Sequence, residues 1–158
     1  MRNLVATSML TLVLAGCAAT PRIVHDKSGA TSTLEDLKGR AVVLTFWVDY
    51  CQPCMAQMPV VLDSVAAHGD QVVFLPVFSR EKPGHRLDGW LSTQPQWFRD
   101  QICWANDDFL RNYDRTLVPR TYVYGRNGRL VEQFDGMIDA RRAPIFQASL
   151  LRALAAVK

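Results

Sequence analysis

The feature that most constrains the fold is a change of hydrophobic period near residue 50. Residues 41–47 form a nearly continuous apolar and β-branched run, which is typical of a strand buried on both faces. Further along, apolar residues recur with the spacing of one helical face: Met58, Val61, Leu62, Val65 and Ala66. Gly69 follows as a helix stop. The sequence therefore predicts a buried strand that leads directly into an amphipathic helix.

Two cysteines, Cys51 and Cys54, lie at this junction in a C-x-x-C motif. Unpaired amides and the positive end of the helix dipole stabilise a thiolate there, and so lower a thiol pKa from its usual value of about 8.5. Sulfurs three residues apart on one turn are within disulfide reach. We predict a redox-active disulfide and no other cofactor. Cys51, the more exposed thiol, is the predicted nucleophile, and Cys54 resolves the mixed disulfide.

Two other interpretations of the motif are weaker. A zinc site needs a second pair of ligands, but the remaining cysteines and histidines are scattered, at Cys17, Cys103, His25, His68 and His85. A purely structural disulfide across so short a loop would constrain the unfolded chain little. No metal site is predicted. Cys103, in an apolar run, is interpreted as a small core residue, with an oxidisable thiol as the alternative.

The first residues predict export. Residues 1–16 have Arg2, an apolar stretch and a small-residue end, and are interpreted as a lipoprotein signal peptide. The run before Cys17 resembles a bacterial lipobox, which implies cleavage and lipidation at Cys17; an ordinary secretory peptide is the alternative. Residues 17–21 then form the lipid anchor and a short tether, and residues 22–158 one domain. In either case disulfide chemistry is expected outside the cytoplasm.

The remaining pattern is that of a small α/β domain. The net charge of +3 in 158 residues favours neither nucleic acid nor an acidic lipid surface as a partner. Strands are predicted at 23–25, 71–78, 101–105, 120–124 and 130–134, the fourth directly after Pro119, with an Asn-Gly turn between the last two. Helical segments are predicted at 34–39, 107–113 and 145–154, the last with an apolar stripe of Ile145, Phe146, Leu150, Leu151 and Leu154. Pro76 is awkward inside its strand, because it cannot donate to the ladder.

These motifs together resemble the thioredoxin-like, membrane-tethered thiol-disulfide oxidoreductases of the TlpA/ResA type. The resemblance covers the chain from about residue 23 and is carried by residues 34–40, 46–54, 55–59, Val118-Pro119 and Asn127-Gly128. It implies a thioredoxin-like α/β fold with a central mixed β-sheet and helices on both faces. It also implies that the Val118–Pro119 bond is cis and lies against the dithiol, so that Val118 can offer its backbone to an extended substrate. The expected substrate-binding residues are Trp47, Tyr50, Gln52, Pro53, Val118 and Pro119. Trp47 and Tyr50 would form an apolar rim, with ordinary packing as the alternative.

Two positions depart from the resemblance. Thioredoxin carries an acid in the central strand beneath its dithiol, where this chain has Thr45, and many TlpA-like chains have a glutamate where this chain has Gln57. The proton acceptor for Cys54 is therefore unassigned. Glu81, Asp49 and a buried water are the candidates.

The resemblance favours a reductant of disulfides outside the cytoplasm, in cytochrome c maturation or envelope redox homeostasis. Its partners would be cysteine-containing exported proteins and an electron donor or acceptor at the membrane or in the periplasm. A disulfide oxidant or isomerase is an alternative, as is a Cu(I) carrier that uses the same two thiolates. Ala18, which follows Cys17, favours the outer membrane over the inner one.

Overall fold

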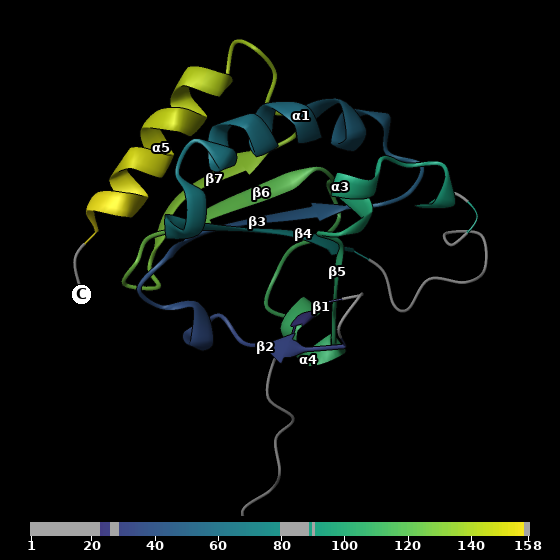
Figure 1. The fold of residues 1–158 in the computed structure, drawn as a ribbon, viewed down its shortest axis with the longest axis horizontal. Helices are drawn as coiled ribbons and strands as arrows, with labels where there is room; N and C mark the ends of the chain where they lie inside the picture. The colour runs from purple at the N-terminus through teal and green to yellow at the C-terminus, as the bar shows by residue number, and fades with distance from the viewer. Residues whose placement is uncertain (1–22, 26–28, 80–88, 90, 157–158) are drawn as a thin grey trace, which may run out of the picture.

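A single mixed sheet of seven strands runs through the computed structural model, which describes residues 23–25, 29–79, 89 and 91–156. The strand order is β2-β1-β5-β4-β3-β6-β7 (Figure 1). The strands are β1 (Ile23–His25), β2 (Thr31–Ser32), β3 (Ala41–Trp47), β4 (Val72–Phe78), β5 (Cys103–Ala105), β6 (Arg120–Tyr124) and β7 (Leu130–Asp135). The helices are η1 (Glu35–Leu37), α1 (Gln52–Ala66), η2 (Gly69–Gln71), α3 (Gln96–Arg99), α4 (Asp107–Leu110) and α5 (Ala143–Ala155).

The predicted buried strand is β3, which lies at the centre of the sheet. All seven of its residues are buried. It pairs in parallel with β4 and antiparallel with β6. Strand β4 forms despite Pro76, which lies opposite Thr45 in the ladder. The antiparallel pairing of β6 with β7 confirms the predicted hairpin.

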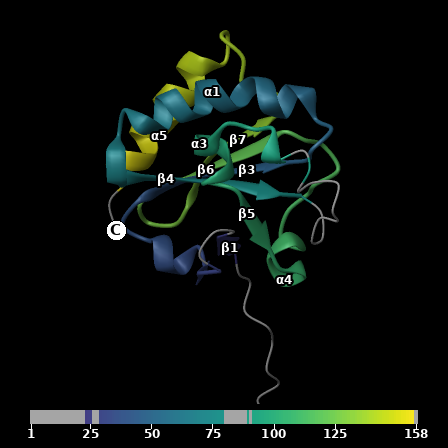
Figure 2. The same ribbon diagram turned by 45° about the vertical axis from the view of Figure 1, so that its right-hand side comes forward.

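Helices cover both faces of the sheet, as expected. Alternate residues of β3 point to opposite faces, so that Val43 belongs to one apolar cluster and Leu44 to another. Helices α1 and α5 pack on the face that carries Val43, whereas α4 and η1 lie on the face that carries Leu44 (Figures 1 and 2). The predicted α/β architecture, a central mixed β-sheet with helices on both faces, is confirmed.

Three details of the helices differ from the prediction. In α5, Ile145 and Leu151 are 54% and 59% exposed, and the buried stripe is Phe146, Ser149, Leu150 and Ala153. In α1, Ala66 is exposed and two polar residues, Gln57 and Ser64, are buried. Helix α4 ends at Leu110, before the predicted end at residue 113. A hydropathy pattern misplaces such stripes because small or hydrogen-bonded polar residues also pack against a sheet.

Several sequence predictions fall outside the described residues. They are the signal peptide, the lipidated Cys17, the tether, Glu81 and His85. Within the residues that the structure describes, no helix is long and apolar enough to cross a bilayer.

Candidate active site

The C-x-x-C motif lies at the start of α1, where β3 has just ended. Cys51 is the N-cap residue, and its Sγ accepts a hydrogen bond from the backbone N–H of Cys54 at 3.1 Å. The two cysteines form a disulfide with an S–S distance of 2.03 Å and a Cα–Cα distance of 5.2 Å. An amide at the positive end of a helix therefore points at the sulfur that the sequence predicts to be the nucleophile.

The two sulfurs differ in access. Cys51 is 7% exposed and Cys54 is fully buried. Cys51 also lines a surface cleft of about 310 Å³ together with Asp49, Tyr50, Gln52 and Met55. A second molecule can thus reach Cys51 first, whereas Cys54 is reached only through Cys51.

The Val118–Pro119 bond is cis, as the resemblance implies. Val118 packs against the apolar cluster that contains both cysteines. The carbonyl of Pro119 accepts a hydrogen bond from Gly136 N at 2.9 Å. Among the described residues, no backbone hydrogen bond uses the N–H or C=O of Val118. These two groups remain available to an extended peptide.

Trp47 does not form part of a rim. Its side chain is fully buried, its Nε1 donates to the carbonyl of Pro76 at 3.2 Å, and its ring meets Phe78 edge to face. The residue belongs to the cluster beneath the two cysteines. The structure therefore corrects the expected rim position, because the last residue of the central strand points into the core.

Tyr50 occupies the rim position. It is 66% exposed and lines both the cleft of Cys51 and a second cleft of about 520 Å³. The second cleft is also lined by Val118 and by the loop residues Asp114, Arg115 and Thr116. Gln52 and Pro53 are exposed beside Cys51, and Pro119 is buried behind Val118.

An uncharged polar set lies under α1. Gln57 is fully buried; its Oε1 accepts from Ile138 N at 3.0 Å, and its Nε2 donates to Thr121 Oγ1 at 3.4 Å. Thr121 Oγ1 in turn lies 3.0 Å from Thr45 Oγ1. The sequence indicated Thr45 and Gln57 as departures from the family pattern, but it gave no sign that Thr121 and Ile138 connect to them.

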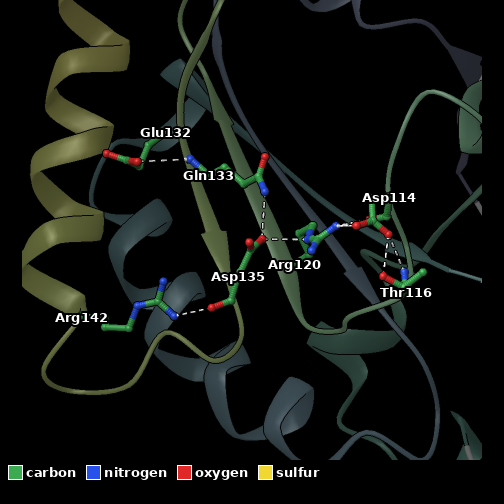
Figure 3. A network of polar contacts seen from close by, with 7 residues as sticks. All are labelled: Asp114, Thr116, Arg120, Glu132, Gln133, Asp135 and Arg142. Atoms are coloured by element: carbon green, nitrogen blue, oxygen red, sulfur yellow. Dashed lines mark hydrogen bonds and ion pairs between the residues drawn. The ribbon is translucent and has the colours of Figure 1, made fainter.

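A charged set lies at the other side of β6 and was not predicted. Arg120, whose side chain is 8% exposed, forms ion pairs with Asp114 and Asp135 (Figure 3). The hydrogen bond from Arg120 holds the pKa of Asp114 far below its usual range, with further bonds from Thr116. An arginine directly after the proline was the only available sequence signal.

The other candidate groups have simple positions. Cys103 is buried, and its Sγ donates to the carbonyl of Gln101 at 3.3 Å, in agreement with a core role. Asp49, a candidate proton acceptor, lines the cleft of Cys51. In the described part of the chain, no three His, Cys, Asp or Glu side chains gather as a metal site would require.

The fold and the motif both have known counterparts. No protein-family model matches the chain. Thiol-disulfide oxidoreductase ResA of Oceanobacillus iheyensis is 27% identical over 124 residues, which are 77% of this chain and 62% of that protein. The chain spans about three fifths of the length of this and other curated relatives.

Two of the solved structures that share the fold illustrate the match. One is a candidate thiol:disulfide interchange protein DsbE from Chlorobium tepidum, with a TM-score of 0.68 and 22% identity over 85% of this chain and 94% of that one. The other is the pneumococcal exposed lipoprotein thioredoxin Etrx1 from Streptococcus pneumoniae, with a TM-score of 0.59 and 23% identity over 77% and 93% of the two chains.

The chain thus has a thioredoxin-like fold, as the resemblance implies, with a disulfide at the start of α1. More particularly, its sequence is similar to thiol-disulfide oxidoreductases of the ResA type, and it shares its fold with the DsbE candidate.

Proposed function

We propose that the protein is a thiol-disulfide oxidoreductase that acts on exported proteins. The observation that carries the proposal is the hydrogen bond of 3.1 Å from Cys54 N to Cys51 Sγ, in a disulfide that opens to a cleft. A sulfur in this position is stabilised as a thiolate by the helix start, and the thiolate is the form that reacts.

Two exchange steps suffice. The Cys51 thiolate attacks one sulfur of a substrate disulfide; that S–S bond breaks, a mixed disulfide forms, and one substrate thiolate leaves. Cys54, once it has released its proton to solvent, attacks Cys51 Sγ and displaces the second substrate thiolate. Two electrons pass to the substrate, whose thiolates take protons from water, and the Cys51–Cys54 disulfide seen in the structure is the product.

The substrate would lie across the exposed residues around Cys51. Tyr50, Gln52 and Pro53 border the sulfur on the side of α1 and its preceding turn, and Val118 borders it from the cis-proline loop. The backbone groups of Val118 would pair with an extended segment of the substrate. Pro119 supports Val118 from behind, and Trp47 supports the cysteines from below.

The favoured direction is reduction, with electrons supplied by a donor at the membrane or in the periplasm. The proposed location is the cell envelope, with Cys17 lipidated and the outer membrane favoured because Ala18 follows it. The lipobox-like sequence supports the anchor, and the fold is shared with Etrx1, which is named an exposed lipoprotein. Cytochrome c maturation and envelope redox homeostasis are the processes in which such a reductant would act.

A trapping experiment tests the proposal. In Cys54→Ser the mixed disulfide on Cys51 cannot be resolved, so envelope proteins should accumulate on this variant and be released by dithiothreitol. Cys51→Ser is the matched control and should trap nothing, because Cys54 and Cys103 are buried. An absence of adducts in the trap variant, together with no reduction of insulin and tight Cu(I) uptake by the intact dithiol, would replace the oxidoreductase by a Cu(I) carrier.

A further inference from the structure

The loop from residue 114 to residue 119 brings Val118 to the cysteines. It contains no regular secondary structure and connects α4 to β6. Its residues line the larger cleft beside Tyr50, and Val118 also packs against the cysteine cluster. A loop of this kind holds one position only if specific contacts fix it.

Arg120 supplies the contacts that close the loop. Its Nη1 donates to the carbonyl of Asp114 at 2.8 Å and lies 2.7 Å from Asp114 Oδ2. The first and last parts of the loop are thus joined by one side chain. Asp114 also accepts from the N–H and the hydroxyl of Thr116, at 2.9 Å and 2.7 Å, which fixes the turn next to it (Figure 3).

The same arginine ties the loop to the sheet. Its Nε lies 2.8 Å from Asp135 Oδ1, and the two residues face each other in the β6–β7 ladder. The carboxylate of Asp135 also accepts from Gln133 Nε2 at 2.9 Å, and its carbonyl accepts from Arg142 at 2.8 Å (Figure 3). The loop is therefore connected to the hairpin and to the segment before α5.

Only an arginine can make this set of contacts. A guanidinium presents several N–H groups in a rigid fork and can bind two carboxylates and a carbonyl at once, whereas the ammonium of lysine is a compact point charge. The side chain is 8% exposed, while its carboxylate partners are 57% and 49% exposed. The buried cation thus lies between the loop and the sheet, and not in the cleft.

We propose that Arg120 is a positioning residue, which fixes the loop 114–119 and holds Val118 where a polypeptide substrate of Cys51 must bind. The inference rests on the proposed function and adds a specific role to a residue outside the motif. Arg120 does not touch the substrate. Its effect should appear with substrates that extend past Cys51 to Val118, and not with a small disulfide that meets Cys51 alone.

The test compares two disulfides as oxidants of the prereduced protein. Insulin is a polypeptide and would extend across the loop, whereas hydroxyethyl disulfide is too small to contact much beyond the sulfur. For Arg120→Lys we expect the rate constant with insulin to fall roughly tenfold, because small displacements of positioning contacts cost one to two orders of magnitude. The rate constant with hydroxyethyl disulfide should change less than about twofold.

A matched control is Arg152→Lys. Arg152 pairs with Glu132 of the same hairpin at 3.0 Å, away from the loop, and its replacement should leave both rate constants unchanged. If Arg120→Lys does not fold, Asp114→Asn is the second test of the inference. It removes the ion pair between Arg120 and the loop by changing an exposed side chain. The rate constant with insulin should again fall, and the one with hydroxyethyl disulfide should not. Equal rates for wild type and the folded variant, or equal losses with both disulfides, would overturn the inference. A wild type that is inert toward both disulfides would instead overturn the proposed function.

Discussion

Strand β6 separates two polar sets of opposite character. Thr121 belongs to the uncharged set under α1, in which Gln57, Thr45 and Thr121 are all fully buried. Its neighbour Arg120 belongs to the charged set, whose carboxylates are about half exposed. Consecutive residues of a strand point to opposite faces, so the two sets share a backbone but not an environment.

The difference shows how polarity is tolerated at different depths. A fully buried polar group is stable when it is neutral and hydrogen-bonded, whereas a buried charge also requires an oppositely charged partner, and here those partners are half exposed. The set beneath the cysteine helix should therefore be insensitive to pH and salt, and the set at the cis-proline loop should respond to both.

The largest expected effect comes from placing a charge in the neutral set. Gln57→Glu places a carboxylate in a fully buried site. Burial disfavours the charged form, so the pKa of this carboxylate rises above its unfolded value of about 4.3. Stability is then retained below that pH and lost as pH rises toward the raised folded value. We expect a loss of about 3 kcal/mol at pH 7 relative to wild type. Urea unfolding at several pH values measures it.

The control for this prediction is Gln147→Glu, the same substitution at an exposed position of α5. It should show no such pH dependence. Equal stability curves for the two variants would mean that Gln57 lies in a wetter site than the structure shows.

A smaller effect is expected when the neutral set loses one hydroxyl. Thr121→Val leaves Gln57 Nε2 and Thr45 Oγ1 without their partner, at a cost of about 1.5 kcal/mol. Because no charge is involved, the loss should be the same from pH 5 to pH 8. Thr45→Val in the Thr121→Val background should cost less than in wild type, because the two hydroxyls bond to each other. Fully additive losses in this double-mutant cycle would argue against a connected set.

The smallest effect on stability is expected in the charged set. Hydrogen bonds hold the pKa of Asp114 below its unfolded value, so its contribution is complete above about pH 4 and is lost as pH falls further. Asp114→Asn should lower Tm slightly at pH 7, and the gap to wild type should close on acidification. Thermal unfolding between pH 7 and pH 3 checks this; a gap that widens in acid would contradict the assigned ion pair.

Local patterns predicted what depends on neighbours in the chain. The change of hydrophobic period around residue 50 located β3, the disulfide and α1. These elements follow one another directly in the chain, so their patterns can be recognised in one short stretch of sequence. The Asn-Gly turn similarly located the hairpin. The cis bond between Val118 and Pro119 was predicted only from the family resemblance. The sequence alone would have favoured a trans bond, because most X–Pro bonds in folded proteins are trans.

Features that depend on strand register were not predictable. Whether Trp47 faces substrate or core is decided by its alternation in β3 and by its bond to Pro76, which is 29 residues away in the chain. Arg120 meets Asp135 because β6 and β7 pair in one particular register. A single sequence gives the residues but not these pairings, so the rim position of Trp47 was wrong and the charged set was missed.

The pKa of Cys51 in the reduced protein tests the central claim most directly. The rate of Cys51 alkylation by iodoacetamide, followed against pH in Cys54→Ser, reports it without interference from the second thiol of the motif. We predict a value below about 7.5, because an amide at the helix start points at the sulfur. A value near 8.5, that of an ordinary free thiol, would contradict the account.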